Sequence, residues 1–192
     1  MTSSTPRTDA RINRARIVEA ARLAIDAAAA TGENLRLNAI AQQAGVGQGT
    51  LYRHFPTRAD LLAEVYRREV DELVALAPIL LRAEAPDVAL ALWFDRVADY
   101  ARVKRGVFAA VEASVWKDLS AHSLGPIGEV ISQLLGAGRA AKVVRADVTA
   151  QDVITLIGFL SRPDESASKE RSRHLLTIVL DGLRPRATSS TS

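Results

Sequence analysis

The chain is divided by glycine and proline into long stretches in which apolar residues recur every three or four positions. This spacing is typical of amphipathic α-helices, and no stretch shows the strict alternation of a β-strand. From Arg11 to Ala30, Ile17 and Ala21 share one face, and Gly32 follows the last turn. The helices predicted in this way cover residues 11–30, 35–44, 48–54, 58–75, 87–103, 105–116, 126–141, 149–160 and 169–183. The pattern therefore predicts an all-α protein of about nine helices.

Charge is unevenly distributed along the 192 residues. The first 60 residues hold eight Lys or Arg against five Asp or Glu, whereas the remaining 132 are balanced at 17 of each. The whole net charge of +3 thus lies in the first third, which is the asymmetry that a polyanion-binding segment needs. Residues 1–10 and 186–192 are rich in Ser and Thr and poor in apolar side chains, so both ends are expected to be disordered tails, the first of them basic.

Several kinds of chemistry are excluded by composition. The sequence contains no cysteine, which removes disulfides, thiol nucleophiles and thiolate metal sites. The three histidines, His54, His122 and His174, are too far apart for a metal pair on one helix face, and we expect no metal and no cofactor. No apolar run approaches the roughly 20 residues that span a bilayer, and the first residues lack the apolar core of a signal peptide. We therefore expect a cytoplasmic protein without a membrane partner.

Two short helices joined by a glycine-containing turn stand out between residues 35 and 54. The first buries Ala41, and Gly45 begins the turn, where a positive φ permits the sharp change of direction. This is the sequence form of a helix-turn-helix, in which the second helix lies in the major groove of DNA. Leu51 and Phe55, four residues apart, are expected to face inward and anchor that second helix.

The second helix carries residues suited to reading DNA. Gln48 can pair with adenine through two hydrogen bonds, Thr50 can contact a base edge or a thymine methyl group, and Gly49 permits a close approach. These three lie at the N-terminal end of the helix, where base contacts are made. Phosphate contacts are predicted for four residues on the flank of this helix and at the start of the next: Tyr52, Arg53, His54 and Arg58.

The stretch IAQQAGVGQGTLYRHFPTRADLL at 40–62 resembles the helix-turn-helix signature of TetR-family transcriptional repressors. With the upstream residues from Arg11, the resemblance extends to Val65, about a third of the chain. It departs from the usual pattern at three positions: Arg36 replaces a Thr, Gly47 a Ser and Gln48 a Lys. Arg36 therefore replaces a hydroxyl contact to phosphate with an ionic one, and Gly47 is a slightly weaker helix cap.

The resemblance implies a homodimeric repressor that binds a palindromic double-stranded DNA operator. It also implies a small-molecule effector, unidentified by the sequence, in the C-terminal helical domain, and release of DNA when that effector binds. The expected domains are the helix-turn-helix at 11–57, a connecting helix at 58–76 and a ligand-binding and dimerisation domain at 77–185.

The effector pocket needs apolar walls and a few polar groups. For the large aromatic residues of the C-terminal domain, a place in the core is the simpler alternative, and for His122 a surface or capping position is the simpler one. With these alternatives open, the candidate ligand contacts are Trp93, Arg96, Tyr100, Phe108, Glu112, Trp116 and His122.

The last two helices are more apolar than a surface helix requires, which is consistent either with a monomer's core or with a dimer interface of four helices. The interface is the favoured interpretation because two reading helices about 34 Å apart bind DNA far more strongly than one. The residues predicted to form it are Val153, Ile154, Ile157, Leu160, Leu175, Leu176 and Val179.

Three further functions compete with a ligand-released repressor. An enzyme is disfavoured because no paired carboxylates, nucleophile with a base, or phosphate-binding loop occurs at a recognisable spacing. A DNA-binding regulator without a ligand, and an activator, are both compatible with the sequence.

Overall fold

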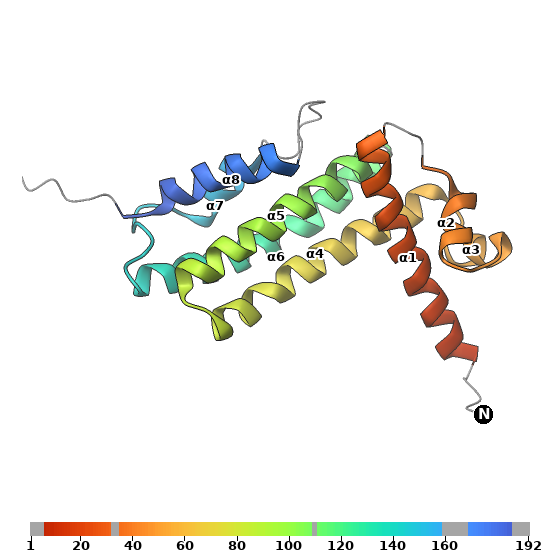
Figure 1. Ribbon diagram of the computed structural model, residues 1–192, viewed down its shortest axis with the longest axis horizontal. Helices are drawn as coiled ribbons and strands as arrows, with labels where there is room; N and C mark the ends of the chain where they lie inside the picture. Colours follow the sequence, from red (N-terminus) through yellow and green to blue (C-terminus); the bar gives the residue numbers. More distant parts are fainter. Residues whose placement is uncertain (1–5, 32–34, 109–110, 159–168, 186–192) are drawn as a thin grey trace, which may run out of the picture. The chain divides into compact units, whose positions relative to one another are not determined.

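The structure is a computed structural model, and it describes residues 6–31, 35–108, 111–158 and 169–185. The described residues form eight α-helices and no β-strand, which confirms the all-α prediction (Figure 1). The helices are α1 (Pro6–Thr31), α2 (Leu37–Gln43), α3 (Gln48–His54), α4 (Arg58–Ala83), α5 (Pro86–Phe108), α6 (Ala113–Ala140), α7 (Ala150–Ile157) and α8 (Lys169–Leu183). No helix in these ranges is both long and apolar enough to cross a membrane.

The chain divides into two compact units. The first contains Met1–Glu69 and Arg102–Leu119, and the second contains Val70–Ala101 and Ser120–Ser192. Helices α4, α5 and α6 each contribute to both units. Residues 102–119, which the sequence placed in the ligand-binding domain, thus cluster with the helix-turn-helix.

The first unit is built around one face of α1. Ile17, Ala21 and Ile25, spaced by four residues, are buried, as are Ile40 on α2 and Leu51 on α3. From α5, Gly106 lies so close to α1 that a Cβ atom there would come within 2.5 Å of the Ile25 Cγ2 atom. The end of α5 is therefore packed directly against the helix that supports the helix-turn-helix.

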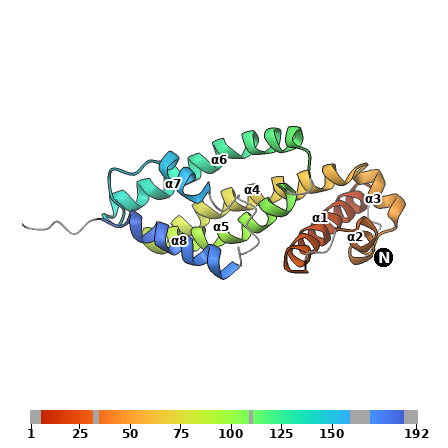
Figure 2. The same cartoon turned by 90° about the horizontal axis from the view of Figure 1, so that it is seen from above.

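The second unit has its core on α5 and α6. Trp93 and Phe94 are buried on α5, in edge-to-face contact at 5.8 Å, and the Trp93 indole N–H donates to the Leu73 carbonyl of α4 at 3.0 Å. Helix α8 lies along α5 (Figures 1 and 2), and the Arg173 guanidinium of α8 forms two hydrogen bonds with the Asp95 carboxylate of α5, at 2.5 and 3.0 Å.

Several predicted helix boundaries are wrong. Helix α4 continues through Pro78 to Ala83, and α6 is one helix through Pro126, where the sequence predicted a break before each proline. A proline inside a helix removes one hydrogen bond and crowds the preceding turn, at a cost of about 3 kcal/mol. Buried residues on both sides, such as Leu119 and Ile127 around Pro126, offset this cost through packing. Because helices at 105–116 and 126–141 are replaced by the longer α5 and α6, the described residues hold eight helices and not nine.

The first helix also begins earlier than predicted. It starts at Pro6, so residues 6–10, expected in a disordered tail, form its first turns. Proline is favoured at the first helical position, and Asp9 in the first turn complements the positive end of the helix dipole. Residues 1–5 and 186–192, the rest of the predicted tails, lie outside the described residues.

Candidate nucleic-acid interface

The turn between α2 and α3 has the geometry that the sequence predicted. Gly45 has a φ of +65°, in the left-handed region that favours glycine. Its N–H donates to the Gln42 carbonyl at 3.0 Å, and the Val46 N–H donates to the Ala41 carbonyl at 3.0 Å. These hydrogen bonds satisfy the last carbonyls of α2 while the chain reverses its direction.

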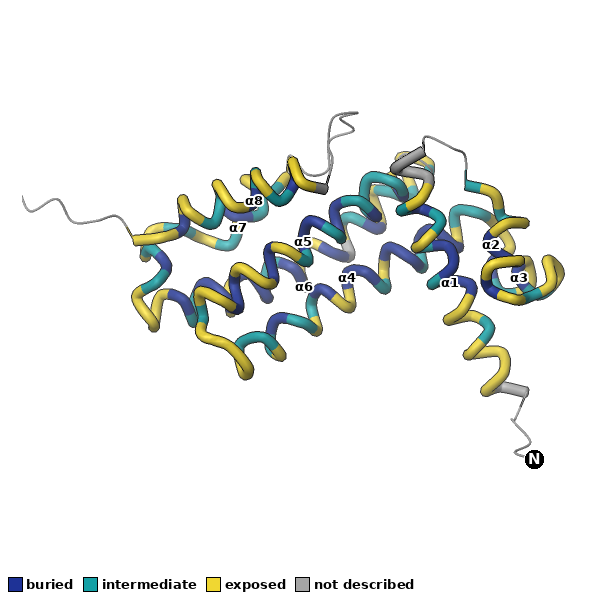
Figure 3. The backbone as a smooth tube through the Cα atoms, viewed as in Figure 1, coloured by how far each residue is buried: buried dark blue, intermediate teal, exposed yellow. Residues whose placement is uncertain are grey.

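Helix α3 has a buried face and an exposed face. Leu51 and the following Phe55 are buried, which confirms that they anchor the helix. Two other predicted residues, Thr50 and His54, are half-buried. The remaining predicted DNA contacts on α3 are exposed, and they form part of the outer surface of the helix-turn-helix (Figure 3): Gln48, Gly49, Tyr52 and Arg53.

A hollow of about 930 Å³ brings several of these residues together with α2 and α4. Its lining includes four of the eight predicted DNA contacts: Arg36, Gln48, Tyr52 and Arg58. It also includes Asn38 and Gln42 of α2, two exposed polar residues that the sequence did not single out. Amide side chains of this kind donate to phosphate oxygens or pair with bases.

The start of α4 holds Arg58 beside this hollow. Thr57 and Asp60 cap the helix reciprocally, because the Thr57 N–H donates to the Asp60 carboxylate at 3.0 Å and the Asp60 N–H donates to the Thr57 hydroxyl at 3.1 Å. Thr57 is therefore the N-cap of this helix. The Nε atom of Arg58 is buried and has no hydrogen-bond partner among the described residues. The helix end thus fixes the backbone of Arg58 at the rim of the candidate interface.

Helix α1 is fastened to the same region through Arg14. Its guanidinium donates to the Glu64 carboxylate of α4 and lies 5.1 Å from the centre of the Phe55 ring. The hydrogen bond from Arg14 lowers the pKa of Glu64, and the same bond raises the pKa of Arg14. Both side chains are partly exposed, so the pair is worth at most about 1 kcal/mol.

The lowered pKa of Glu64 predicts a pH-dependent contribution to stability. The contribution is present above the unfolded-state pKa of about 4.3 and is lost as the pH falls through the lower folded-state pKa. Glu64→Gln is therefore expected to lower the free energy of unfolding by about 0.5 kcal/mol at pH 7, and by progressively less below about pH 4. Urea unfolding of both proteins at several pH values measures this difference, and a difference independent of pH would contradict the assignment.

The predicted ligand contacts are divided between the two units. Trp93, Arg96 and Tyr100 lie in the second unit, where Trp93 and Tyr100 are buried and Arg96 pairs with Glu72 at 3.3 Å. Phe108, Glu112 and Trp116 lie in the first. The side chain of His122 lies outside the described residues.

Trp116 is the centre of an aromatic cluster in the first unit. Its ring meets Tyr66 of α4 at 5.4 Å and Phe108 of α5 at 5.1 Å, both edge to face. The Lys104 ammonium lies 5.7 Å from the centre of the indole ring, and burial lowers the pKa of Lys104. The end of α5 and the start of α6 are thus joined to α4 by aromatic packing and a desolvated cation.

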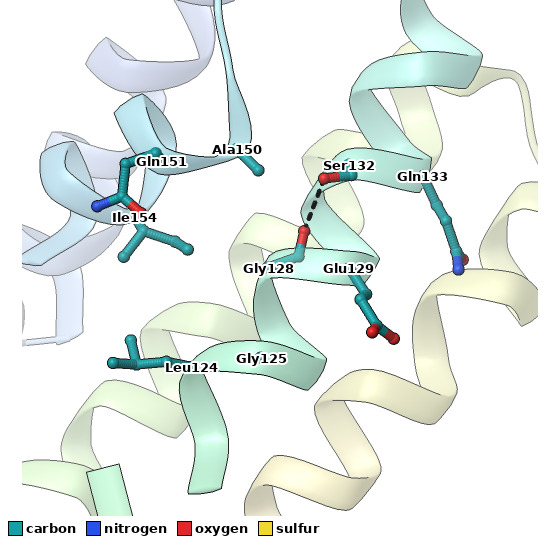
Figure 4. A pocket seen from close by; sticks show the side chains of 9 residues that line it. All are labelled: Leu124, Gly125, Gly128, Glu129, Ser132, Gln133, Ala150, Gln151 and Ile154. Carbon is teal, nitrogen blue, oxygen red and sulfur yellow. Dashed lines mark hydrogen bonds between the residues drawn. The ribbon is translucent and has the colours of Figure 1, made fainter. Parts of the chain in front are cut away.

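Two open hollows lie among the described residues of the second unit, and one predicted dimer residue, Ile154, lines the smaller of them. Figure 4 shows this hollow, of about 560 Å³, between α6 and α7, with Leu124 and Ile154 at one end and Glu129 and Gln133 at the other. The larger groove, of about 1030 Å³, runs between α5 and α8 and includes Leu92 and Leu180. Both are lined by a mixture of apolar and charged or amide side chains.

The residues predicted to form a dimer interface fall into two groups. Val153 and Leu176 are buried within the single chain, among the residues of its own core. Four others are half-buried on α7 and α8: Ile154, Ile157, Leu175 and Val179. Leu160 lies outside the described residues. The large apolar residues that these helices expose are instead Leu156 and Ile178, which the sequence reasoning did not select.

The fold and the α2–α3 surface define a helix-turn-helix regulator. Residues 17–65 match the family profile described as bacterial regulatory proteins, tetR family. Residues 85–185 match the profile described as transcriptional regulator SbtR-like, C-terminal domain, which covers more than half of the chain. The chain belongs to the TetR family of transcriptional regulators.

Several solved structures of TetR-family regulators are similar to this chain. A TetR transcriptional regulator from Streptomyces coelicolor is 38% identical, with a TM-score of 0.73, over 91% of this chain and 99% of that one. A TetR regulatory protein from Mycobacterium vanbaalenii is 33% identical, with a TM-score of 0.72, over 94% and 100%. RolR in complex with resorcinol shares only the fold, at 20% identity and a TM-score of 0.53, over 91% and 89%.

The match to curated proteins is confined to one region. HTH-type transcriptional regulators of Staphylococcus aureus are 45% identical over 65 residues, which is 34% of this chain and 34% of each relative. The chain thus matches about a third of the length of these relatives.

Proposed function

We propose that the protein is a homodimeric repressor that binds a palindromic operator through α3 and leaves it when a small molecule binds. The observation that carries the DNA-binding part is the outer surface of α3, where Gln48, Gly49 and Tyr52 are exposed while Leu51 holds the helix from behind. An exposed polar helix on a rigid support is what reading the major groove requires.

Base contacts and phosphate contacts come from neighbouring residues on this surface. Gln48 and Thr50 lie in the first turn of α3 and reach base edges. Gln48 also borders the hollow between α2 and α4, where Arg36, Tyr52 and Arg58 contact phosphates. Arg53 and His54, in the last turn of α3, contact further phosphates.

The dimer is supported by the apolar residues that α7 and α8 leave uncovered. Leu156 and Ile178 are each about half exposed, at 51% and 54%, and half-buried Ile154, Leu175 and Val179 lie on the same two helices. Two copies joined through this surface, called here the α7–α8 face, would place a second α3 for the other half of a two-fold operator.

Selection of bound duplexes from a random pool, at a fixed and stated salt concentration, tests the DNA-binding proposal. An inverted repeat whose half-sites are centred about one or two helical turns apart is the expected result. The same selection with Thr50→Ala should relax the preference at one position of each half-site. Enrichment of no sequence by the unaltered protein would overturn the proposal.

Substitution of Gly49 should change DNA binding and folding stability in opposite directions. A Cβ atom at this position would meet nothing within 4 Å in the free protein, and alanine is a better helix former than glycine by about 1 kcal/mol. Gly49→Ala is therefore expected to raise the free energy of unfolding while weakening operator binding about tenfold, because the methyl group occupies the space of a base edge. Urea unfolding and a binding titration measure the two effects. Unchanged operator affinity would show that Gly49 does not face the bases.

Release by a small molecule is supported by the way the end of α5 joins the first unit. Arg102 pairs with Asp26 of α1 at 3.4 Å, Gly106 packs against Ile25, and Trp116 contacts Tyr66 of α4. A ligand that displaces α5 or α6 would therefore displace α1 and α4, which support the helix-turn-helix. The coupling needed is on the order of 1–3 kcal/mol.

Regulation without a ligand is the second candidate, and one observation favours it: the structure divides the predicted ligand residues between two units. The genes beside the selected operator would suggest compounds to add to the protein–operator complex. Release by one of them supports the regulated repressor, whereas tight binding unaffected by every such compound supports the ligand-free regulator. Transcription from the operator with and without the protein separates a repressor from an activator.

A further inference from the structure

Three of the five arginines on α1 have the same chemistry but different surroundings. Arg14 is bonded to Glu64 and lies over Phe55. Arg22 pairs with Glu19 at 2.7 Å and Asp26 at 3.4 Å. Arg16 is exposed, and within the described ranges it has no hydrogen bond, ion pair or ring contact.

The Arg16 guanidinium lies on the turn of the helix-turn-helix. Its Nη2 atom is 2.6 Å, and its Cζ atom 3.6 Å, from the position that a Cβ atom on Gly45 would occupy. Gly45 therefore serves two purposes, because it adopts the positive φ of the turn and leaves room for the guanidinium. The arginine is held against the turn three residues before Gln48, the first residue of α3.

In the part of the chain that the structure describes, no carboxylate forms an ion pair with this guanidinium. It presents five N–H donors in a fixed plane, a geometry that matches the oxygens of a phosphate. The carbonyls of Ala41 and Gln42 nearest the turn already accept backbone N–H groups, and none of the hydrogen bonds of the described residues joins Arg16 to a carbonyl. The side chain thus lies against the turn at Gly45 while its donors remain available.

We propose that Arg16 binds a backbone phosphate of the operator beside the helix-turn-helix turn. This inference rests on the proposed DNA-binding function. In a docked helix-turn-helix the first helix crosses the phosphate backbone and the second enters the groove, so the turn between them lies close to the backbone. Arg16 is therefore a binding residue contributed by α1, in addition to those of α2, α3 and α4, and it contributes affinity without sequence preference.

Substitution of Arg16 combined with salt titration tests the proposal. Affinities of the unaltered protein and of Arg16→Gln are measured between about 50 and 200 mM salt, on the selected operator and on an unrelated duplex of equal length. Loss of one phosphate contact per protomer is expected to reduce the slope of the logarithm of the binding constant against the logarithm of the salt concentration by about 0.9 per protomer. Binding to both duplexes should weaken by a similar factor. Arg16→Lys, which keeps the charge, should retain the salt slope.

Arg82→Gln is the matched control, because Arg82 is also an exposed helical arginine without a partner among the described residues, and it lies in the second unit. It should leave both the slope and the affinity unchanged. Urea unfolding of Arg16→Gln detects a purely structural role for the guanidinium over Gly45.

Two results would overturn the inference while leaving the proposed function intact. One is operator binding by Arg16→Gln with an unchanged salt slope. The other is a lower free energy of unfolding that accounts for the whole loss of affinity. Failure of the unaltered protein to bind any duplex would overturn the proposed function together with this inference.

Discussion

Ile178→Glu is expected to produce a folded monomer whose operator affinity is lower by about 10²-fold or more. The side chain is 54% exposed on α8 in the single chain, so a carboxylate there remains hydrated and does not disturb the core. In a dimer joined through the α7–α8 face, the same carboxylate would be buried without a partner, at a cost of several kcal/mol. Loss of the second reading helix removes the avidity that two linked sites provide.

Ile79→Glu is the matched control for this prediction. Ile79 is 52% exposed on α4, and it is also a large apolar residue of the second unit. The Ile79→Glu protein should remain dimeric in sedimentation equilibrium and keep its operator affinity. A dimer that persists in Ile178→Glu at micromolar concentration would show that the interface lies elsewhere on the molecule.

Trp93→Ala is expected to lower the free energy of unfolding by about 3–5 kcal/mol, the range for removal of a large buried aromatic side chain. Trp93 is 0% exposed, and its indole N–H is bonded to the Leu73 carbonyl, so the substitution leaves a cavity and a carbonyl without its partner. The adjacent Leu92 is 45% exposed, and Leu92→Ala should cost less than about 1 kcal/mol.

Urea unfolding of the two variants measures this difference, and it also decides between the two roles considered for Trp93. A core residue gives the large loss of stability whether or not an effector is present. A loss below about 1 kcal/mol would show that Trp93 lines a cavity instead of filling the core, as a ligand contact would.

The helix-turn-helix was predictable because its signals are local. Gly45 at the turn, Leu51 and Phe55 at a spacing of four, and Thr57 three residues before Asp60 each specify a short-range structure. No distant contact is needed to interpret them. Helix α3 consequently has the predicted bounds, Gln48–His54.

The long helices were harder to delimit because their boundaries depend on packing across the fold. Proline and glycine predict a break wherever local preferences act alone. Pro78 and Pro126 are nevertheless inside helices, where burial of the neighbouring apolar residues outweighs the lost hydrogen bond. Helix α5 also continues through Lys104, where the sequence predicted a boundary, and its Gly106 allows close contact with Ile25.

The inner and outer faces of α7 and α8 could not be assigned from the sequence, because each helix carries large apolar residues on both faces. Val153 and Leu176 face the core of their own chain, and Leu156 and Ile178 face outward. Which residues face inward depends on where α5 and α6 lie, and the periodicity of one helix carries no such information. The different surroundings of Arg14 and Arg16 depend in the same way on distant residues. Glu64, which bonds Arg14, lies 50 positions further along the chain, and Gly45, beside Arg16, lies 29 positions further along.

The central claim, that two copies of α3 read DNA at a fixed separation, is tested most directly by changing the spacing of the operator. The affinity of the protein is measured for the selected inverted repeat and for the same duplex with about five base pairs, or half a helical turn, inserted between its halves. Paired reading predicts a loss of about 10²-fold, because the second half-site rotates to the opposite side of the duplex. Equal affinity for both duplexes would contradict the account and would show that each reading helix binds on its own.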